Sequence, residues 1–384
     1  MRDLAQEMLR QGHEPVVIVP SCELSSSWAT EDLDGVQVLR LAGIHTRHAS
    51  YIRRTVSELL LPFVMVRSLR KSPFRNTRWD LVAWYSPPIF FGPLIWVLKR
   101  TSGCRTYLIL RDIFPEWAFD LGLLHKGPAY WFFKAVSNFQ NAMADTVGVQ
   151  TPSNLGYLAN WSRSSGRKLE VLQNWQTPAT DIGSSIMVNN TLLAGRKIFI
   201  YIGNMGVAQS MDVLIDLADC LKHRSDLGFL FVGRGSEVPR LKALVRARAL
   251  TNSLFFDEVD SREMPGLLAQ CHVGLLALDT RHKSHNIPGK FLTYLLAGLR
   301  VLARVKAGTD LERLIENQGV GRVYAGESVD VLRMFAEEIV DTPDVYDRMA
   351  SCGRALAERM FSPAAAVSQI IATASDSFFD GTRH

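Results

Sequence analysis

The sequence lacks the features that mark membrane-spanning, secreted or zinc-stabilised proteins. Its 384 residues contain no run of about eighteen uninterrupted apolar residues, so no membrane-spanning helix is expected. Its five cysteines are scattered without a Cys-x-x-Cys pair, which argues against a disulfide framework and a structural zinc site. The first residues are those of a polar amphipathic helix, not of a signal peptide. We therefore expect a cytoplasmic protein with no metal and no bound cofactor.

Acidic residues are scarce in one segment of the first half. The first 175 residues carry 20 Lys and Arg against 14 Asp and Glu, and the excess lies between Tyr51 and Arg78, where Glu58 is the one acid. The basic residues there are Arg53, Arg54, Arg67, Arg70, Lys71, Arg75 and Arg78. Since they enclose the apolar run 59–66, the segment predicts contact with an anionic membrane surface; a solvated basic face over a core helix explains it equally well. Nucleic acid is disfavoured because aromatic stacking residues are not interleaved with the charges.

The order of the predicted elements indicates an α/β protein with two Rossmann-like domains. Short β-rich runs alternate with helical segments in both halves, as in parallel sheets covered by helices. We predict an N-terminal domain over 1–175, a linker over 176–195 and a C-terminal domain over 196–361. A last helix, 362–380, is placed to cross back to the first domain. Ligands are expected in the cleft between the two domains.

The first domain begins abnormally. Its first element is a helix over residues 2–9, whereas a doubly wound sheet begins with a strand that lies inside the sheet. Without that strand its neighbours would carry unpaired backbone groups, each costing about 1–3 kcal/mol if buried. We therefore expect that this polypeptide lacks a first strand and the glycine turn that would follow it.

Lys290 is the strongest candidate for binding an anion. It lies in the first turn of a predicted helix that opens at Pro288-Gly289, after Asn286-Ile287. A cation at the positive end of a helix is unfavourable unless an anion lies between it and the amides, and a phosphate fits best. The alternative is a solvated lysine on a helix face.

Two glycine turns follow strands in the second half. Gly203-Asn204-Met205-Gly206 leads to Gln209, and Gly233-Arg234-Gly235 repeats the arrangement one unit later. Such turns let a backbone approach a ligand closely, but they also serve simple helix packing. Neither has the full Gly-x-Gly-x-x-Gly spacing of a dinucleotide fold, so NAD is disfavoured.

Asp112 is the candidate polar residue of the first half. It follows a predicted strand that ends at Leu110, and ligands bind at the carboxyl ends of strands in open α/β sheets. It is expected to face the cleft, with Arg111 as a possible partner. A helix N-cap before Pro115-Glu116 is the alternative.

Taken in series, these segments resemble the retaining GT-B glycosyltransferases of family 4, which act in bacterial surface polysaccharide assembly. The resemblance extends over nearly the whole chain through 12–20, 86–88, 112–116, 171–175, 203–209, 231–235, 264–268 and 287–298. Within the family it is most similar to transferases of acetamido-dideoxy sugars such as N-acetylfucosamine. It implies a UDP-sugar donor, a lipid-linked saccharide acceptor and peripheral attachment to the inner face of the plasma membrane.

The resemblance also implies roles for individual residues. Lys290 would hold the donor diphosphate, helped by the amides of Gly203–Gly206 and of the helix start, while Gly233–Glu237 and Phe255–Val259 would flank the base. Asp112 would face the donor sugar or the acceptor. Two positions depart from the family's pair of glutamates, since His285 and Thr293 stand there. Asn204 and Gln209 replace the usual basic residues at the phosphate turn, where Arg234 is placed to assist Lys290.

Three functions are therefore compatible with the sequence. The first is transfer of a hexose-derived sugar from UDP to a lipid-linked saccharide. The second is a non-catalytic GT-B remnant that binds a nucleotide or a partner enzyme. The third is a sugar-nucleotide epimerase, for which Asp112 with Glu116 would be the candidate acid–base pair.

Overall fold

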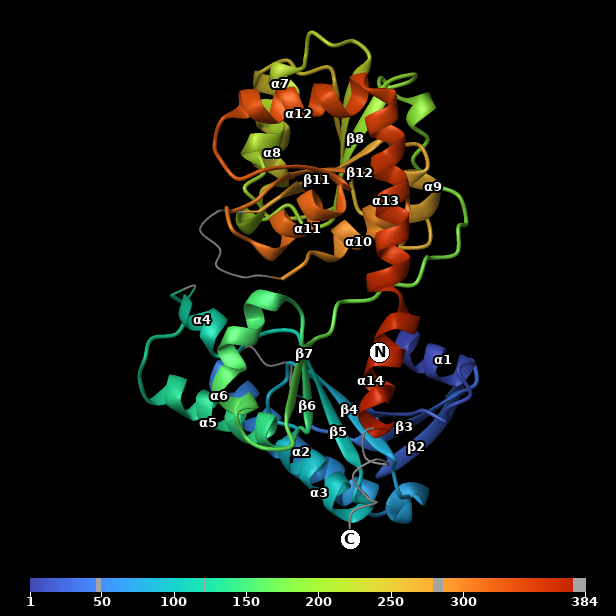
Figure 1. Cartoon of the computed structure of the whole chain (residues 1–384), viewed down its shortest axis with the longest axis vertical. Coiled ribbons are helices and arrows are strands. Elements are labelled where there is room, and N and C mark those ends of the chain that lie inside the picture. The colour runs from blue at the N-terminus through green and yellow to red at the C-terminus, as the bar shows by residue number, and fades with distance from the viewer. Residues whose placement is uncertain (46–49, 121, 279–285, 376–384) are drawn as a thin grey trace. The chain divides into compact units, whose positions relative to one another are not determined.

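The computed structural model describes residues 1–45, 50–120, 122–278 and 286–375, and it contains two compact units. Unit 1 comprises Met1–Gln173 together with the residues from Pro363 onward, and unit 2 comprises Asn174–Ser362. Each unit is an α/β structure built on parallel strands, so the predicted fold class is confirmed (Figure 1).

Unit 1 contains two separate sheets. Its strands are β1 (Val16–Ser21), β2 (Trp28–Leu33), β3 (Val36–Ala42), β4 (Leu81–Ser86), β5 (Arg105–Leu110), β6 (Thr146–Val149) and β7 (Lys168–Val171). One sheet has the order β1-β3-β2 and the other the order β4-β5-β6-β7. All pairings are parallel except β2 with β3, a hairpin that the sequence analysis did not predict. Its turn, Asp34-Gly35, has positive φ at both residues, which matches the right-handed twist of a hairpin.

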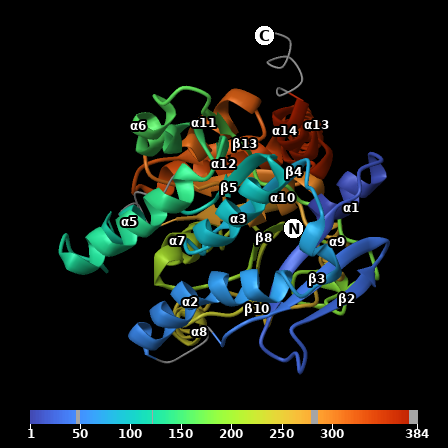
Figure 2. The same ribbon diagram turned by 90° about the horizontal axis from the view of Figure 1, so that it is seen from below.

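Helices cover both faces of these sheets. They are α1 (Arg2–Arg10), α2 (Tyr51–Leu69), α3 (Gly92–Ser102), α4 (Glu116–Asp120), α5 (Pro128–Ala142), α6 (Ala159–Ser162) and α14 (Pro363–Ser375). Helix α3 contacts both α2 and α5, and Figures 1 and 2 show these three side by side. Helices α1 and α14 contact each other, and α14 lies on β4 and β5. Unit 1 therefore has an α2/α3/α5 layer and a separate α1/α14 pair.

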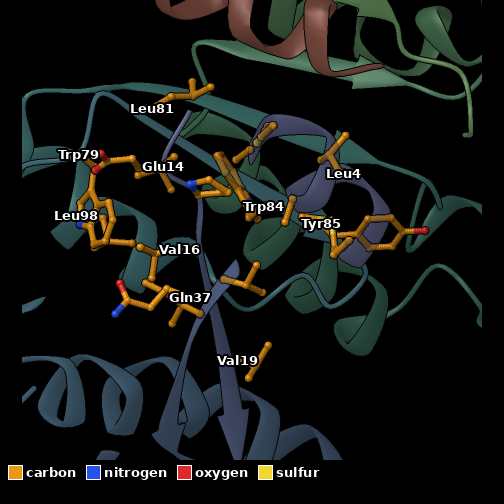
Figure 3. Close-up of a pocket in the computed structure, with 18 of the residues that line it drawn as sticks. Leu4, Glu14, Val16, Val19, Gln37, Trp79, Leu81, Trp84, Tyr85 and Leu98 are labelled. Carbon is orange, nitrogen blue, oxygen red and sulfur yellow. The ribbon is translucent and has the colours of Figure 1, made fainter. Parts of the chain in front are cut away.

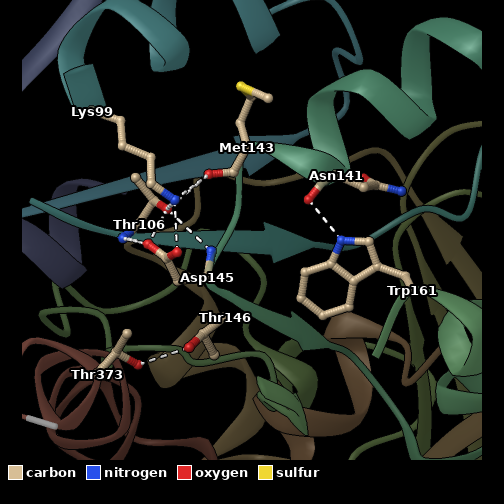
Figure 4. A network of polar contacts seen from close by, with 8 residues as sticks. All are labelled: Lys99, Thr106, Asn141, Met143, Asp145, Thr146, Trp161 and Thr373. Carbon is tan, nitrogen blue, oxygen red and sulfur yellow. Dashed lines mark hydrogen bonds and ion pairs between the residues drawn. The ribbon is translucent and has the colours of Figure 1, made fainter. Parts of the chain in front are cut away.

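Polar contacts, partly or fully buried, tie these layers to the beginnings of β5 and β6 (Figure 4). Lys99 of α3 donates to Asp145 at 2.6 Å, and the same carboxylate accepts from the hydroxyl and the backbone amide of Thr106. On α14, the Thr373 hydroxyl donates to Thr146 of β6 at 3.4 Å. The carboxylate is thus satisfied by a cation and two donors, and the C-terminal helix is fixed to the sheet of unit 1.

Unit 2 is one continuous six-stranded parallel sheet. Its strands are β8 (Lys197–Ile202), β9 (Leu227–Val232), β10 (Ser253–Phe256), β11 (Val273–Ala277), β12 (Arg300–Arg304) and β13 (Gly321–Tyr324). Their order is β10-β9-β8-β11-β12-β13, so the first strand of the unit lies in the middle of its sheet. Its helices are α7 (Asp212–Cys220), α8 (Val238–Ala247), α9 (Met264–Leu268), α10 (Gly289–Leu296), α11 (Asp310–Gln318), α12 (Val329–Asp341) and α13 (Pro343–Phe361).

Two apolar cores hold this sheet between helical layers. One core joins the sheet to α9, α10, α11 and α13, and the other joins it to α7, α8 and α12. Part of the segment expected to be a linker belongs to the first core, because Ile186, Val188 and Leu193 are buried there. Ser362 lies between the last two helices, of which α13 belongs to unit 2 and α14 to unit 1.

Candidate functional site

The candidate site of unit 2 is built at the carboxyl ends of β8 and β9. Gly233 lies so close to the neighbouring turn that an added Cβ would be 2.1 Å from the Gly203 carbonyl oxygen. An added Cβ on Gly235 would be 2.2 Å from the Met205 carbonyl oxygen. The Gly203 and Met205 amides donate to the carbonyls of Val232 and Arg234, which joins the two turns. Gly233 and Gly235 therefore let the two turns pack backbone against backbone, and their contact with a donor stays a prediction.

Lys290 lies over this pair of turns. Its Nζ is 3.7 Å from the centroid of the Tyr201 ring and 3.9 Å from the position that a Cβ on Gly203 would occupy. Burial lowers the pKa of the Lys290 ammonium to about 7. Burial is the one cause of this shift, and among the described residues no carboxylate pairs with the ammonium. A half-buried cation over an aromatic face and beside a glycine turn is arranged to receive an anion.

The start of α10 differs by one position from the expectation. Pro288 is the extended N-cap residue and Gly289 is the first helical residue, so Lys290 is the second. Asn286 lies two residues before the cap. Lys290 remains in the first turn, where the helix leaves backbone amides without intrahelical partners.

Amide side chains organise the first glycine turn. Gln209 Oε1 accepts from the Gly206 amide at 3.0 Å and from Asn204 Nδ2 at 3.3 Å. Tyr201 donates its hydroxyl to the Asn204 carbonyl at 2.7 Å. Asn204 and Gln209 thus hold the turn in shape, and the same tyrosine lies under the Lys290 ammonium.

Two further predicted residues have partners of their own. The Thr293 hydroxyl on α10 accepts a hydrogen bond from Gln176 Nε2 at 3.1 Å and donates one to the Gly289 carbonyl at 3.3 Å. Arg234 is exposed and pairs with Glu258 at 3.0 Å. His285, which stands at the position of one of the family's two glutamates, lies outside the residues that the structure describes.

Asp112 belongs to unit 1 and is half-buried after β5. Its carbonyl accepts from the Phe114 amide, and α4 begins four residues after it, at Glu116. The neighbouring Arg111 donates to the carbonyls of Leu172 and Gln173 at 2.8 and 3.2 Å. Burial lowers the pKa of the Arg111 guanidinium to about 10. Arg111 therefore connects the end of β5 to the segment after β7.

Sequence reasoning assigned no role to Tyr201 or Gln176, which contact Lys290 and Thr293. It included Glu258, the partner of Arg234, only as part of the segment Phe255–Val259 expected to flank the base. Tyr201 had a signal, because it stands two residues before Gly203 at the end of a predicted strand. Gln176 had none, since it is far from Thr293 in the sequence. Across the described residues, no three His, Cys, Asp or Glu side chains gather closely enough to hold a metal ion. Nor does that part of the chain contain a helix with the length and apolar content needed to cross a membrane.

Two curated proteins are similar to this chain. One is the "Putative colanic acid biosynthesis glycosyl transferase WcaI" of Escherichia coli (strain K12), 27% identical over 277 residues, which are 66% of this chain and 65% of that protein. The other is the "Probable glycosyltransferase WbjE" of Pseudomonas aeruginosa, 24% identical over 255 residues, which are 64% and 62%. The chain thus spans slightly less than two thirds of each relative. No family model matches it.

Solved structures resemble the chain over a larger part of its length. Sucrose-phosphate synthase from Thermosynechococcus elongatus has a TM-score of 0.68 at 14% identity and covers 99% of this chain and 93% of its own. Anabaena HepE in complex with UDP-glucose has a TM-score of 0.57 at 17% identity, with 82% of each chain covered. The order of the strands in unit 2 and these likenesses lead to one conclusion: the chain has the GT-B fold.

Proposed function

We propose that this chain is a glycosyltransferase that moves a hexose from a UDP-sugar to a lipid-linked saccharide in the assembly of a bacterial surface polysaccharide. The observation that carries the proposal is the half-buried Lys290 ammonium beside the Gly203 turn, with no carboxylate partner among the described residues. The similarity to WcaI and WbjE, both named as glycosyltransferases, supports transfer over the non-catalytic and epimerase alternatives.

A nucleoside diphosphate suits the chemistry of this site. Its diphosphate is an anion that would restore the charge balance of Lys290 and accept from backbone amides at the start of α10. The Gly203, Met205 and Gly206 amides of the glycine turn already donate to acceptors within the protein. HepE, which shares the fold, was solved with UDP-glucose, and that supports UDP as the nucleotide. The resemblance to transferases of acetamido-dideoxy sugars supports an acetamido-deoxy hexose as the transferred group.

The reaction proposed is transfer with retention at the anomeric carbon. The bond from that carbon to the diphosphate breaks while the acceptor oxygen bonds to the same face of the sugar, and the hydroxyl proton passes to the departing diphosphate. Negative charge grows on the departing diphosphate, so a cation and amides already in place lower the barrier most. Lys290 supplies the cation and Asp112 contacts the sugar or the acceptor. This scheme assigns no role to a metal.

The protein is proposed to bind the cytoplasmic face of an anionic membrane through α2, and to meet the lipid-linked acceptor there. This helix exposes apolar side chains, among them Tyr51, Ile52 and Phe63 at 86, 77 and 56%. Basic residues predicted to meet the membrane are also exposed, namely Arg53, Arg54, Arg67, Arg70 and Lys71. On the neighbouring α3 and α5, Trp96 and Trp131 are exposed as well, and tryptophan suits the membrane interface. Basic and apolar groups on one layer of helices favour membrane contact over a merely solvated face.

A transfer assay tests the function. Purified chain is incubated with labelled UDP-hexoses, with and without an acetamido group, and with lipid-linked saccharides in anionic vesicles. We expect labelled lipid product whose anomeric configuration matches the donor, and at least tenfold less of it with Asp112→Asn. The affinity for UDP should be unchanged in that variant, because Asp112 is assigned to the sugar or the acceptor and not to the nucleotide. Donor binding without product from any acceptor would support the remnant, and a changed sugar without transfer would support the epimerase.

A further inference from the structure

Helix α10, which carries Lys290, is weakly held by its own sequence. It has eight residues, and helices shorter than about twelve residues are marginal without tertiary contacts. Its N-cap residue, Pro288, makes no side-chain capping bond, and its first residue is Gly289, the poorest helix former after proline. Lys290 adds a cation at the positive end of the helix dipole. The position of the Lys290 ammonium therefore depends on contacts between α10 and other parts of unit 2.

Two of these contacts lead to the two ends of unit 2. Gln176 is the third residue of the unit, and its side-chain amide lies on the Thr293 hydroxyl, with Nε2 at 3.1 Å and Oε1 at 3.2 Å. Phe361 is the last residue but one of the unit, and its ring packs edge-on against Phe291, with the ring centroids 6.2 Å apart. Helix α10 is thus fixed both where the chain enters unit 2 and where it leaves.

A third contact joins these two ends to each other. The Gln176 backbone amide donates to the Phe361 carbonyl at 3.0 Å. The rings of Phe291 and Phe361 are 0 and 1% exposed, so neither has room to move alone. Gln176, Phe291, Thr293 and Phe361 therefore form one closed set of contacts, which we call the α10 clamp. A displacement of α10 displaces both ends of unit 2, and the reverse also holds.

The clamp holds the face of α10 that carries the ammonium. Thr293 follows Lys290 by three residues, and residues at this spacing lie on one face of a helix. Without the bond from Gln176, the first turn of α10 is free to shift against the Gly203 turn. A charged group that is misplaced by as little as about 1 Å binds or stabilises its ligand much less well.

We propose that Gln176 is a positioning residue of the donor site, which sets the position of Lys290 through Thr293. Through its bond to Phe361 it also couples the binding of a diphosphate to both ends of unit 2. The inference rests on the proposed function, in which Lys290 holds the donor diphosphate. Because coupling is reciprocal, a bound diphosphate should stabilise the clamp by the factor by which the clamp raises diphosphate affinity.

The affinities for UDP and for inorganic pyrophosphate test this role by calorimetry. Pyrophosphate has neither ribose nor base, so it reports the phosphate contacts alone. Gln176→Ala should weaken both ligands by the same factor, about tenfold. The control is Gln270→Ala, another half-buried glutamine, which follows α9 and accepts from the Val188 amide at 2.8 Å. It should bind both ligands as the parent does. A loss of UDP affinity with unchanged pyrophosphate affinity would mean that Gln176 acts on the nucleoside, and would overturn the proposal.

A double-mutant cycle separates positioning from a general loss of structure. In a Lys290→Ala background no ammonium is left to misplace, so Gln176→Ala should weaken pyrophosphate binding further by no more than about twofold. A loss of the same size in both backgrounds would show that Gln176 acts independently of Lys290, and would contradict the proposal.

Hydrogen exchange tests the clamp with and without ligand. Without ligand, the amides of α10 should exchange about tenfold faster in Gln176→Ala and at the parent rate in Gln270→Ala, with β9 as the internal reference. With pyrophosphate, exchange in the segment 174–178 should slow in the parent but not in Lys290→Ala. Equal exchange of α10 in the parent and in Gln176→Ala would overturn this inference alone. No pyrophosphate binding by the folded parent chain would instead contradict the proposed function, and this inference with it.

Discussion

The two units of this molecule differ in what lies at the centre of their sheets. In unit 2 the first strand, β8, pairs with β9 on one side and β11 on the other. In unit 1 the strands that correspond by order, β1 and β4, do not pair with each other, and a cavity lies between them (Figure 3). Among the described residues the parallel sheet is therefore continuous in unit 2 and divided into two sheets in unit 1.

The comparison shows that the first strand of unit 2 has two structural roles. In unit 2 it fills the core, since Ile198, Phe199, Ile200 and Tyr201 are all 0% exposed. It also delivers the Gly203 turn under Lys290 at its carboxyl end. Unit 1 has neither contribution from the described residues, so its sheet is divided and its candidate polar residue, Asp112, follows a later strand. A central strand thus determines both the core and the turn that a ligand meets.

The largest expected effect is loss of membrane binding when basic residues on the surface of unit 1, but not of unit 2, are replaced. Replacing Arg53, Arg54, Arg70 and Lys71 of unit 1 by Glu should abolish sedimentation with anionic liposomes, a loss of a thousandfold or more, because each basic residue contributes about 1 kcal/mol. The matched control reverses four exposed charges of unit 2, namely Lys222, Arg246, Lys306 and Arg359. Equal binding by the unit 1 variant and the parent would refute membrane contact through α2.

The next largest expected effect is a loss of stability when the glycine turns after β8 and β9 can no longer pack against each other. Gly233→Ala places a Cβ 2.1 Å from the Gly203 carbonyl oxygen, at a φ of 145° that suits glycine. We expect the free energy of unfolding, from urea denaturation, to fall by about 3 kcal/mol or more. Gly289→Ala is the control, since an added Cβ there meets no atom within 4 Å. If both variants unfolded at the same urea concentration, the packing argument would be wrong.

A smaller effect is the pH dependence of donor binding. The pKa of Lys290 is about 7 in the protein without ligand, and a bound diphosphate raises it because the anion favours the charged form. Affinity for a UDP-sugar should therefore be highest below pH 7 and fall up to tenfold per pH unit above it, with proton uptake on binding. Lys290→Arg, which keeps its charge, should give a flat profile in calorimetry at pH 6 to 9. A sloping profile in that variant would assign the titration to another group.

Much of this architecture could be predicted from local sequence. The apolar runs Ile198–Ile202 and Arg300–Ala303 are bounded by turn residues and belong to the short β-rich runs predicted to form the parallel sheet; they coincide within a residue with β8 and β12. The strand β2 was missed although its Asp34-Gly35 turn is a hairpin signal, because its residues are polar and alternate poorly. The division of the first sheet was anticipated from the helix at residues 2–9, which stands where a doubly wound fold begins with a strand.

The site was less predictable, since its contacts join distant parts of the chain. Lys290 was identified by the conflict between its charge and the start of a helix, a local signal. Its contact with the Tyr201 ring joins α10 to β8, and these elements are nearly ninety residues apart in the sequence. No local sequence pattern encodes such a contact. The contribution of Ile186 and Val188 to a core was obscured by the polar residues around them, which made the whole segment resemble a linker.

The most direct test of donor binding in unit 2 is calorimetry of UDP, GDP and dTDP with the parent chain, Lys290→Ala and the surface control Lys222→Ala. The account predicts selective binding of UDP, retained by the control and weakened ten- to a hundredfold by Lys290→Ala, as removal of a charged hydrogen-bond partner costs about 1.5–3 kcal/mol. UDP binding of equal strength in all three proteins, or none by the folded parent chain, would contradict it.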